Sequence, residues 1–260
     1  MPDPRIRIAR DGPIATVTFT REEARNAFDL AMWAALHEAM DALSAEDALR
    51  CVVLRGAGTA AFSAGADIKS FATERGTPEQ EARYAPIFHD AMQSIRCCRH
   101  PVVAMILGHC LGGGAGIATM CDFRVGGEGI RFGITANRMG LWYPHAEIAP
   151  ILALAGSGVA AEMLIEGRIF TGREAYERGL LSRLVTDDAV EAEALALAGR
   201  IAAGAPLAAR FHKAAIAALL GPLPMPAAAQ ATAGGFVQTE DFRDAVRAFA
   251  ERRPPRFVGK

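Results

Sequence analysis

The chain has 260 residues, 51% of them hydrophobic, and 28 lysines and arginines stand against 29 aspartates and glutamates. This length allows one or two domains with a sizeable core, and a net charge of −1 gives no general attraction to nucleic acid or to an anionic membrane surface. The five cysteines are an odd number without CxxC spacing, and we see neither a leader-like start nor an apolar run of the roughly 20 residues that a membrane span needs. We therefore expect a soluble, cytoplasmic protein with reduced thiols, no metal site, no nucleic-acid partner and no membrane partner.

The first half of the sequence alternates between strand-like and helix-like patterns. Residues 5–19 alternate apolar and polar side chains around an Asp-Gly pair, which predicts an antiparallel hairpin. Residues 26–43 place apolar side chains three and four apart, which predicts an amphipathic helix. Residues 51–56 and 101–108 are continuously apolar and end in glycine, as in strands that are buried on both faces. Each of these two strands is followed by a loop of small residues and then by a plausible helix.

Those two loops, residues 56–71 and 108–118, are the candidate site. Between them, residues 72–100 have a helical but polar pattern, and we expect Pro78 and Pro86 to interrupt it. Loops held by a rigid scaffold commonly carry function, so this polar segment is a candidate mobile flank of the site.

The sequence past residue 185 is alanine-rich and helical, with breaks expected at 204–206 and 221–226. This change of composition places a boundary near residue 190. The predicted organisation is a core over residues 1–190 and a helical region over residues 191–260.

The second loop contains four glycines within residues 112–116. It lacks the lysine of a phosphate-binding loop and the spacing of a dinucleotide fingerprint. Two readings remain open: the glycines let a helix start close to a strand, or they present backbone amides to a ligand. The first amides of a helix have no intrahelical partner and favour negative charge, so they could form half of an oxyanion hole.

Four separated segments resemble the crotonase, or enoyl-CoA hydratase/isomerase, superfamily: AFSAGADIK (61–69), GHCLGGGAGIATMCD (108–122), RFG (131–133) and GRIFTGREAYERGLLSRLV (167–185). The match is collinear over nearly the whole chain. The resemblance implies an α/β fold, a spiral of repeated ββα units with a C-terminal helical trimerisation region. It also implies a homotrimer or a dimer of trimers acting on acyl-CoA thioesters, with coenzyme A entering only as part of the substrate.

The resemblance assigns the oxyanion hole to the backbone amides of Ala66 and Gly113, which would polarise the thioester carbonyl. The nucleotide and pantetheine parts of CoA are expected along the backbone at Ala64, Ala66, Asp67 and Ile68. Lys69 is a candidate partner for the CoA phosphates, the alternative being an ordinary solvated lysine.

Two positions depart from the hydratase pattern. Hydratases of the superfamily use two glutamates, one in GGGxE and one after the FG-x-P turn, and this chain has Gly116 and Ala136 at those positions. A positioned acid or base typically contributes about 10²- to 10⁴-fold in rate. The sequence therefore predicts an enzyme that stabilises an enolate, a lyase or isomerase, with an unidentified proton handler.

Two alternatives follow from these departures. Some superfamily decarboxylases of malonyl-type CoA esters carry a threonine and a tyrosine placed like Thr135 and Tyr143, and loss of CO₂ needs no base. Against this, the histidine of those decarboxylases is replaced here by Ala66. The second alternative is a non-catalytic oligomer that binds acyl-CoA.

Several other side chains near these motifs are chemically reactive types. His145 and Glu147 follow Tyr143, and either is a candidate substitute acid or base, the alternative being a surface pair. His89 and His109 are expected to be structural. Cys110 is expected to be a buried, inert thiol.

Overall fold

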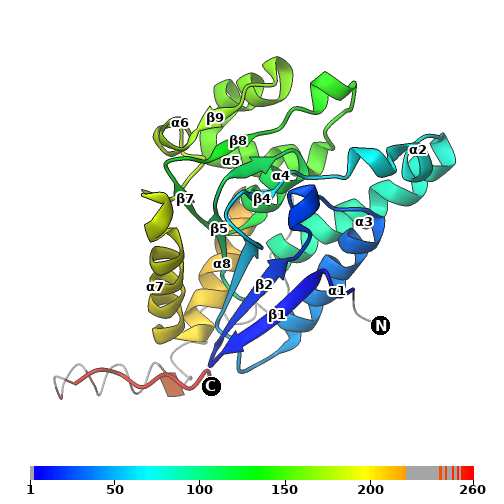
Figure 1. The fold of residues 1–260 in the computed structure, drawn as a ribbon. Helices are drawn as coiled ribbons and strands as arrows, with labels where there is room; N and C mark the ends of the chain where they lie inside the picture. Colours follow the sequence, from blue (N-terminus) through cyan, green and yellow to red (C-terminus); the bar gives the residue numbers. More distant parts are fainter. Residues whose placement is uncertain (1–2, 221–239, 242–243, 245–247, 249–250, 252) are drawn as a thin grey trace.

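The computed structural model describes residues 3–220 and 253–260, together with residues 240, 241, 244, 248 and 251. The break expected at 221–226 lies outside the described residues. Two sheets and the helices around them form this part of the chain (Figure 1).

The larger sheet has six strands in the order β1-β2-β3-β5-β7-β10. β1 and β2 pair antiparallel, which confirms the predicted hairpin, and the strands from β2 to β10 are parallel. The strands are β1 (Ile6–Asp11), β2 (Ile14–Phe19), β3 (Cys51–Gly56), β5 (Val102–Ile106), β7 (Phe123–Gly127) and β10 (Arg183–Val185).

The smaller sheet has four short strands in the order β4-β6-β8-β9. Its first three strands are parallel and the last is antiparallel to β8. Three successive units thus each give one strand to the larger sheet, one to the smaller sheet, and then a helix: β3-β4-α3, β5-β6-α4 and β7-β8-α5. This confirms the predicted α/β architecture of repeated ββα units. The strands are β4 (Ala61–Ser63), β6 (His109–Leu111), β8 (Arg131–Gly133) and β9 (Phe170–Thr171).

The predicted amphipathic helix is α1 (Leu30–Ala45), which begins four residues later than the apolar pattern suggested. The Asp29 side chain caps it by accepting a hydrogen bond from the Met32 amide. Upstream, Asn26 has a positive φ of 54° and Phe28 pairs with Ala66, so these residues cannot be helical.

The polar segment after the first loop forms α2 (Phe71–Glu74) and α3 (Pro78–Cys97). Pro78 begins α3 behind a capping box on Thr77, a position where proline is well tolerated. The expected interruption at Pro86 is wrong, because Pro86 lies inside the helix. Packing explains this: α3 lies along α1 (Figure 1) and buries one face against it, which offsets the hydrogen bond that a proline removes. The buried residues of α3 include Tyr84, Phe88, Met92 and Ile95.

Both faces of the larger sheet are covered, which explains its continuously apolar strands. In β3, Val52 and Leu54 belong to the main core with α1, α3 and α4 (Gly113–Met120), whereas Cys51 and Val53 pack against α7 (Val190–Ala203). Figure 1 shows α7 on the side of the sheet opposite α1 and α3. The chain continues into α8 (Pro206–Leu220). The assignment of 191–260 to oligomerisation stays a prediction.

The third unit ends in α5 (His145–Ala161), which bends at Gly156 with a φ of 77° and continues into a π-helical turn at Glu162–Glu166. α6 (Gly172–Glu177) follows β9. Among the described residues, the segment from His145 to Glu166 is long and apolar enough to cross a membrane by length and composition, and 28% of its apolar 18-residue stretch is buried. Core helices of water-soluble proteins share these properties, so this helix alone is weak support for a membrane span.

Candidate active site

The two glycine-bearing loops meet directly behind the short strands β4 and β6. Gly65 has a φ of 87°, and a Cβ there would lie closer than 3.0 Å to the Gly113 amide nitrogen. A Cβ on Gly114 would come equally close to the Ser63 carbonyl oxygen. Glycine is therefore required at both positions so that the two backbones can approach each other.

This approach brings together the amides of Ala66 and Gly113, since a Cβ built on Gly113 lies 3.5 Å from the Ala66 nitrogen. Phe28 pairs with the first of these loops in parallel fashion: its amide donates to the Gly65 carbonyl at 2.8 Å and its carbonyl accepts from the Asp67 amide at 2.7 Å. In such a bridge the intervening residue directs its own N–H to the other side. The Ala66 amide therefore points away from Phe28.

The second amide is free for a different reason. Gly113 is the first residue of α4, after Gly112 with φ 53° and ψ −124°, and the first amides of a helix have no intrahelical acceptor. Within the described part of the chain, neither the Ala66 nor the Gly113 amide donates a backbone hydrogen bond. Two free donors at close range are the arrangement that stabilises an oxyanion.

Trp33 supports this arrangement from α1. Its ring lies next to Gly113, where an added Cβ would be 3.0 Å from the nearest ring carbon. The indole N–H donates to the Tyr84 hydroxyl at 2.8 Å, and both side chains are buried. The start of α4 therefore rests on a rigid aromatic surface.

Tyr143 occupies the space beside Gly116. A Cβ on Gly116 would lie closer than 3.0 Å to the Tyr143 hydroxyl and 3.1 Å from Met92 Cε. The hydroxyl is buried and has no hydrogen-bond partner among the described residues. Burial raises the pKa of Tyr143 strongly, and the nearby Glu147 carboxylate acts in the same direction. Tyr143 is thus a neutral, unpartnered hydroxyl where the resemblance would place a glutamate.

The structure separates the two titratable candidates that follow Tyr143. His145, the first residue of α5, is exposed. Glu147 is fully buried and its Oε1 lies 2.7 Å from Nδ1 of His89 on α3, while its Oε2 is buried without a hydrogen-bond partner in the described part of the chain. Their adjacency in sequence gave no means to choose between them, and only the packing of α5 on α3 and α4 does so.

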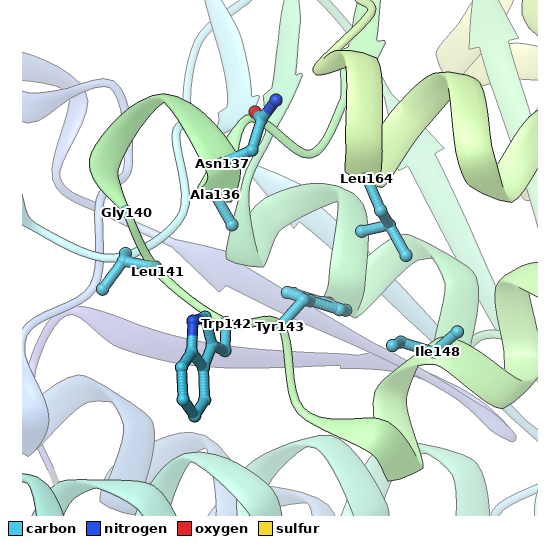
Figure 2. Close-up of a pocket in the computed structure, with 8 residues that line it drawn as sticks. All are labelled: Ala136, Asn137, Gly140, Leu141, Trp142, Tyr143, Ile148 and Leu164. Atoms are coloured by element: carbon cyan, nitrogen blue, oxygen red, sulfur yellow. The ribbon is translucent and has the colours of Figure 1, made fainter.

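A cavity of about 390 Å³ adjoins this cluster. Figure 2 shows Tyr143, Ile148 and Leu164 facing it, with the loop from Ala136 to Trp142 along its other side. Its wall is mostly apolar, as in sites for small organic groups. The lining residues are Ala136, Asn137, Gly140, Leu141, Trp142, Tyr143, Ile148 and Leu164.

The predicted CoA-contacting residues lie at the rim of the first loop. Ala64 and Ala66 are half-buried, whereas Ile68 and Lys69 are exposed. The Asp67 carboxylate is occupied by a 2.7 Å ion pair with Arg21 and a hydrogen bond from the Lys69 amide. Although burial opposes ionisation, these contacts hold the pKa of Asp67 below its ordinary value, so this side chain orders the loop.

The remaining candidates are placed as follows. Thr135 is half-buried at the start of the 3₁₀ turn Ala136–Met139 and does not cap it with its side chain. Cys110 is buried in β6, and burial raises its thiol pKa well above the ordinary value. That thiol is therefore neutral, as expected of an inert core cysteine. His109, on the same strand, is half-buried.

The sequence model of the enoyl-CoA hydratase/isomerase family matches residues 9–260. The chain is 32% identical to enoyl-CoA hydratase EchA19 of Mycobacterium tuberculosis, over 99% of this chain and 97% of that protein. It is 31% identical to (E)-benzylidenesuccinyl-CoA hydratase of Thauera aromatica, over 95% of this chain and 96% of that protein. Its structure is similar to the crystal structure of an enoyl-CoA hydratase/carnithine racemase from Magnetospirillum magneticum, with a TM-score of 0.94, 42% identity, and coverage of 99% and 97%.

Proposed function

Because the chain belongs to the enoyl-CoA hydratase/isomerase family, we propose that it acts on acyl-CoA thioesters by stabilising a thioester enolate at the amides of Ala66 and Gly113. The observation that carries this proposal is the close pair of backbone amides, neither of which has an acceptor among the residues that the structure describes. A thioester carbonyl oxygen placed there would gain two hydrogen bonds as it becomes an enolate oxygen. One such donor is typically worth about 10²- to 10³-fold in rate.

The remaining parts of the site fit the same substrate class. The acyl group would enter the apolar cavity beside Tyr143, and CoA would run along the backbone from Ala64 to Lys69. The proposed chemistry uses the thioester and the protein's own residues. Gly116 and Ala136 provide no carboxylate, so a hydratase mechanism with two glutamates is not proposed.

We also propose the assembly that the resemblance implied, a homotrimer or a dimer of trimers. Large apolar side chains that remain exposed on the single chain support it. Among them are Leu152 on α5, with 44% of its surface exposed, and Ile216, Leu219 and Leu220 on α8, with 57%, 87% and 54% exposed.

Decarboxylation of a malonyl-type CoA ester is the second candidate, and the buried Tyr143 hydroxyl favours it. Loss of CO₂ would leave the electron pair as an enolate at the two amides, and Tyr143 would donate the proton. Methylmalonyl-CoA and ethylmalonyl-CoA are the substrates to test, with mass spectrometry of the product. A product in wild type that Tyr143→Phe abolishes supports this candidate, and an unchanged Tyr143→Phe enzyme contradicts it. Thr135→Val tests whether the Thr135 hydroxyl takes part in the same decarboxylation.

The main test compares two Gly→Ala variants on a thioester panel of crotonyl-CoA, longer 2-enoyl-CoAs and 3-enoyl-CoAs. Gly65→Ala forces a Cβ against the Gly113 amide, and we expect kcat/KM to fall at least 100-fold. Gly12→Ala is the matched control, because Gly12 also has a positive φ, 54°, but has nothing within 4 Å of the added Cβ. It should retain wild-type kcat/KM despite comparable backbone strain.

Three results decide between the hypotheses. Equal losses in the two variants would contradict the oxyanion-hole assignment. Tight binding of acyl-CoA without turnover of any thioester would favour the non-catalytic oligomer. Melting temperatures measured for both variants separate loss of fold from loss of the amide geometry.

A further inference from the structure

We propose that Glu147, held by His89, is the group that moves the proton at the carbon next to the thioester carbonyl. The inference rests on the proposed function, because it needs an acyl-CoA whose carbonyl lies at the two amides. It goes further by naming the acid-base residue that the positions of Gly116 and Ala136 lack.

Glu147 differs from the other buried carboxylates of the described residues. Asp67 is paired with Arg21, and Asp241 accepts hydrogen bonds from backbone amides near the C-terminus. Glu147 is fully buried, and His89 is its one side-chain partner among the described residues. Its Oε2 has no partner within the described residues. An unsatisfied buried carboxylate oxygen is costly, and a native structure that keeps one calls for an explanation such as a catalytic role.

The carboxylate belongs to the same cluster as the start of α4. Tyr143 places its hydroxyl against Gly116, and Glu147 follows Tyr143 in the first turn of α5, the helix that packs on α4. Gly116 follows Gly113 by three residues, which is about 4.5 Å along a helix. The segment that carries Glu147 therefore contacts α4 within one turn of the proposed oxyanion amide.

The third side of this cluster comes from α3. Met92 Cε would lie 3.1 Å from a Cβ on Gly116, and His89 precedes Met92 by one helical turn on the same face. His89 thus reaches Glu147 from the helix that also closes the space beside Gly116. Its side chain is 45% exposed, whereas that of Glu147 is fully buried.

The chemistry balances without another reactant. Oε2 of Glu147 accepts the proton from the α-carbon, the C–H electrons form the enolate double bond, and the carbonyl electrons move to the oxygen held by Ala66 and Gly113. If the proton on the Glu147 carboxyl is replaced by one from solvent before it returns to the same carbon, the α-carbon gains a solvent hydrogen. In a 3-enoyl-CoA, return to the γ-carbon gives the 2-enoyl-CoA. His89 is a positioning residue, because its hydrogen bond holds Oε1 and leaves Oε2 without a partner among the described residues, free to accept a proton.

The experiment measures deuterium incorporation at the α-carbon of butyryl-CoA and of 3-butenoyl-CoA in D₂O by mass spectrometry. Glu147→Gln keeps the shape but cannot accept the proton, and we expect exchange to slow at least 100-fold, in line with the usual contribution of a positioned base. The matched control is Glu166→Gln, an exposed acid at the far end of the same helical segment, which should exchange at the wild-type rate.

The role of His89 is tested separately. His89→Ala should lower kcat about tenfold with KM within twofold, whereas His89→Asn, whose amide N–H can replace Nδ1–H, should recover most of the loss. A purely structural histidine would not show this rescue. An unchanged kcat in His89→Ala would overturn the positioning role.

The outcomes also separate this inference from the proposed function. If Glu147→Gln exchanges within threefold of wild type while Gly65→Ala is inactive, the oxyanion hole stands and the role of Glu147 is wrong. If wild type shows neither deuterium exchange nor conversion with any of the thioesters, the proposed function and the role of Glu147 are both wrong. Since Glu147→Gln could also lose stability, Glu147→Asp is measured in parallel: it keeps the charge but withdraws the carboxylate, and intermediate exchange supports the inference.

Discussion

The overlap between Gly116 and the Tyr143 hydroxyl predicts a measurable coupling in stability. In Gly116→Ala the added Cβ would lie closer than 3.0 Å to the hydroxyl oxygen and 3.1 Å from Met92 Cε. Overpacking of this kind costs about 1–3 kcal/mol. Alanine also gains about 1 kcal/mol over glycine inside a helix, so the single variant should lose up to about 2 kcal/mol.

Tyr143→Phe removes the closer of the two obstructions, and the end of the flexible Met92 side chain needs to shift by only a few tenths of an ångström. The hydroxyl is buried and has no described partner, so its loss should be neutral or stabilise the fold by about 1 kcal/mol. In the double variant the nearest ring carbon would remain 3.6 Å from the new Cβ, which is ordinary contact. The alanine then keeps its helical advantage, and the coupling free energy between the two sites should be about 1–3 kcal/mol.

Urea denaturation of wild type, both single variants and the double variant, at one protein concentration, measures this coupling. Gly199→Ala is the control, because Gly199 lies in α7 with nothing within 4 Å of an added Cβ, and it should be stabilised by about 1 kcal/mol. Additive effects of the two mutations, within about 0.5 kcal/mol, would refute the steric reasoning.

Two further predictions concern buried polar groups. Burial, with neighbouring arginines, lowers the pKa of His100 to about 4. Because the unfolded chain binds the proton more readily than the folded chain, the free energy of unfolding should fall as the pH drops from 7 to 4.5. Urea denaturation at each pH should show a fall that is roughly 2–3 kcal/mol larger in wild type than in His100→Phe. The buried Arg124 donates to the carbonyls of Leu180 and Cys121 at 3.0 and 2.6 Å. Arg124→Met should therefore lower the free energy of unfolding by about 3 kcal/mol, whereas Arg173→Met, at an exposed arginine, should lower it by less than about 0.5 kcal/mol. Denaturation midpoints measure both changes.

Local patterns were enough to predict the elements that frame the site. The strands β1 and β2 correspond to the alternating residues 5–19, and β3 and β5 correspond to the apolar residues 51–56 and 101–108. These predictions succeed because the alternation and the burial of a strand can be recognised from residues that are adjacent in sequence. The glycine run likewise marked the start of α4 at Gly113.

Residue patterns alone did not predict the strands of the smaller sheet, for a physical reason. Its strands β4, β6, β8 and β9 have two or three residues each, too few for a period of two to be recognised. β4 and β6 lay inside what the sequence indicated as loops, whereas β8 and β9 lay inside two of the segments that carried the family resemblance. Pro86 was misjudged in a similar way, because local propensity does not include the packing of α3 on α1.

The proton-handling residue was the part least accessible from sequence. His145 and Glu147 differ by two positions, and the turn at the start of α5 exposes one and buries the other. No periodic pattern indicates which of them faces α3. Only the hydrogen bond to His89 identifies Glu147 as the buried candidate.

These observations suggest why one half of the site is readable in sequence and the other is not. The proposed oxyanion donors are backbone amides, so their placement demands small residues at fixed positions, notably Gly65 and Gly113, and leaves a recognisable motif. A proton-transfer group needs only a carboxylate that reaches the same space, and any neighbouring helix can provide it. Because the Tyr143 hydroxyl fills the volume beside Gly116, a carboxylate at that position of α4 has no room, and the carboxylate proposed for proton transfer is that of Glu147 on α5. The proposed chemistry therefore keeps the fixed backbone donors of the family while drawing its acid-base group from a different helix.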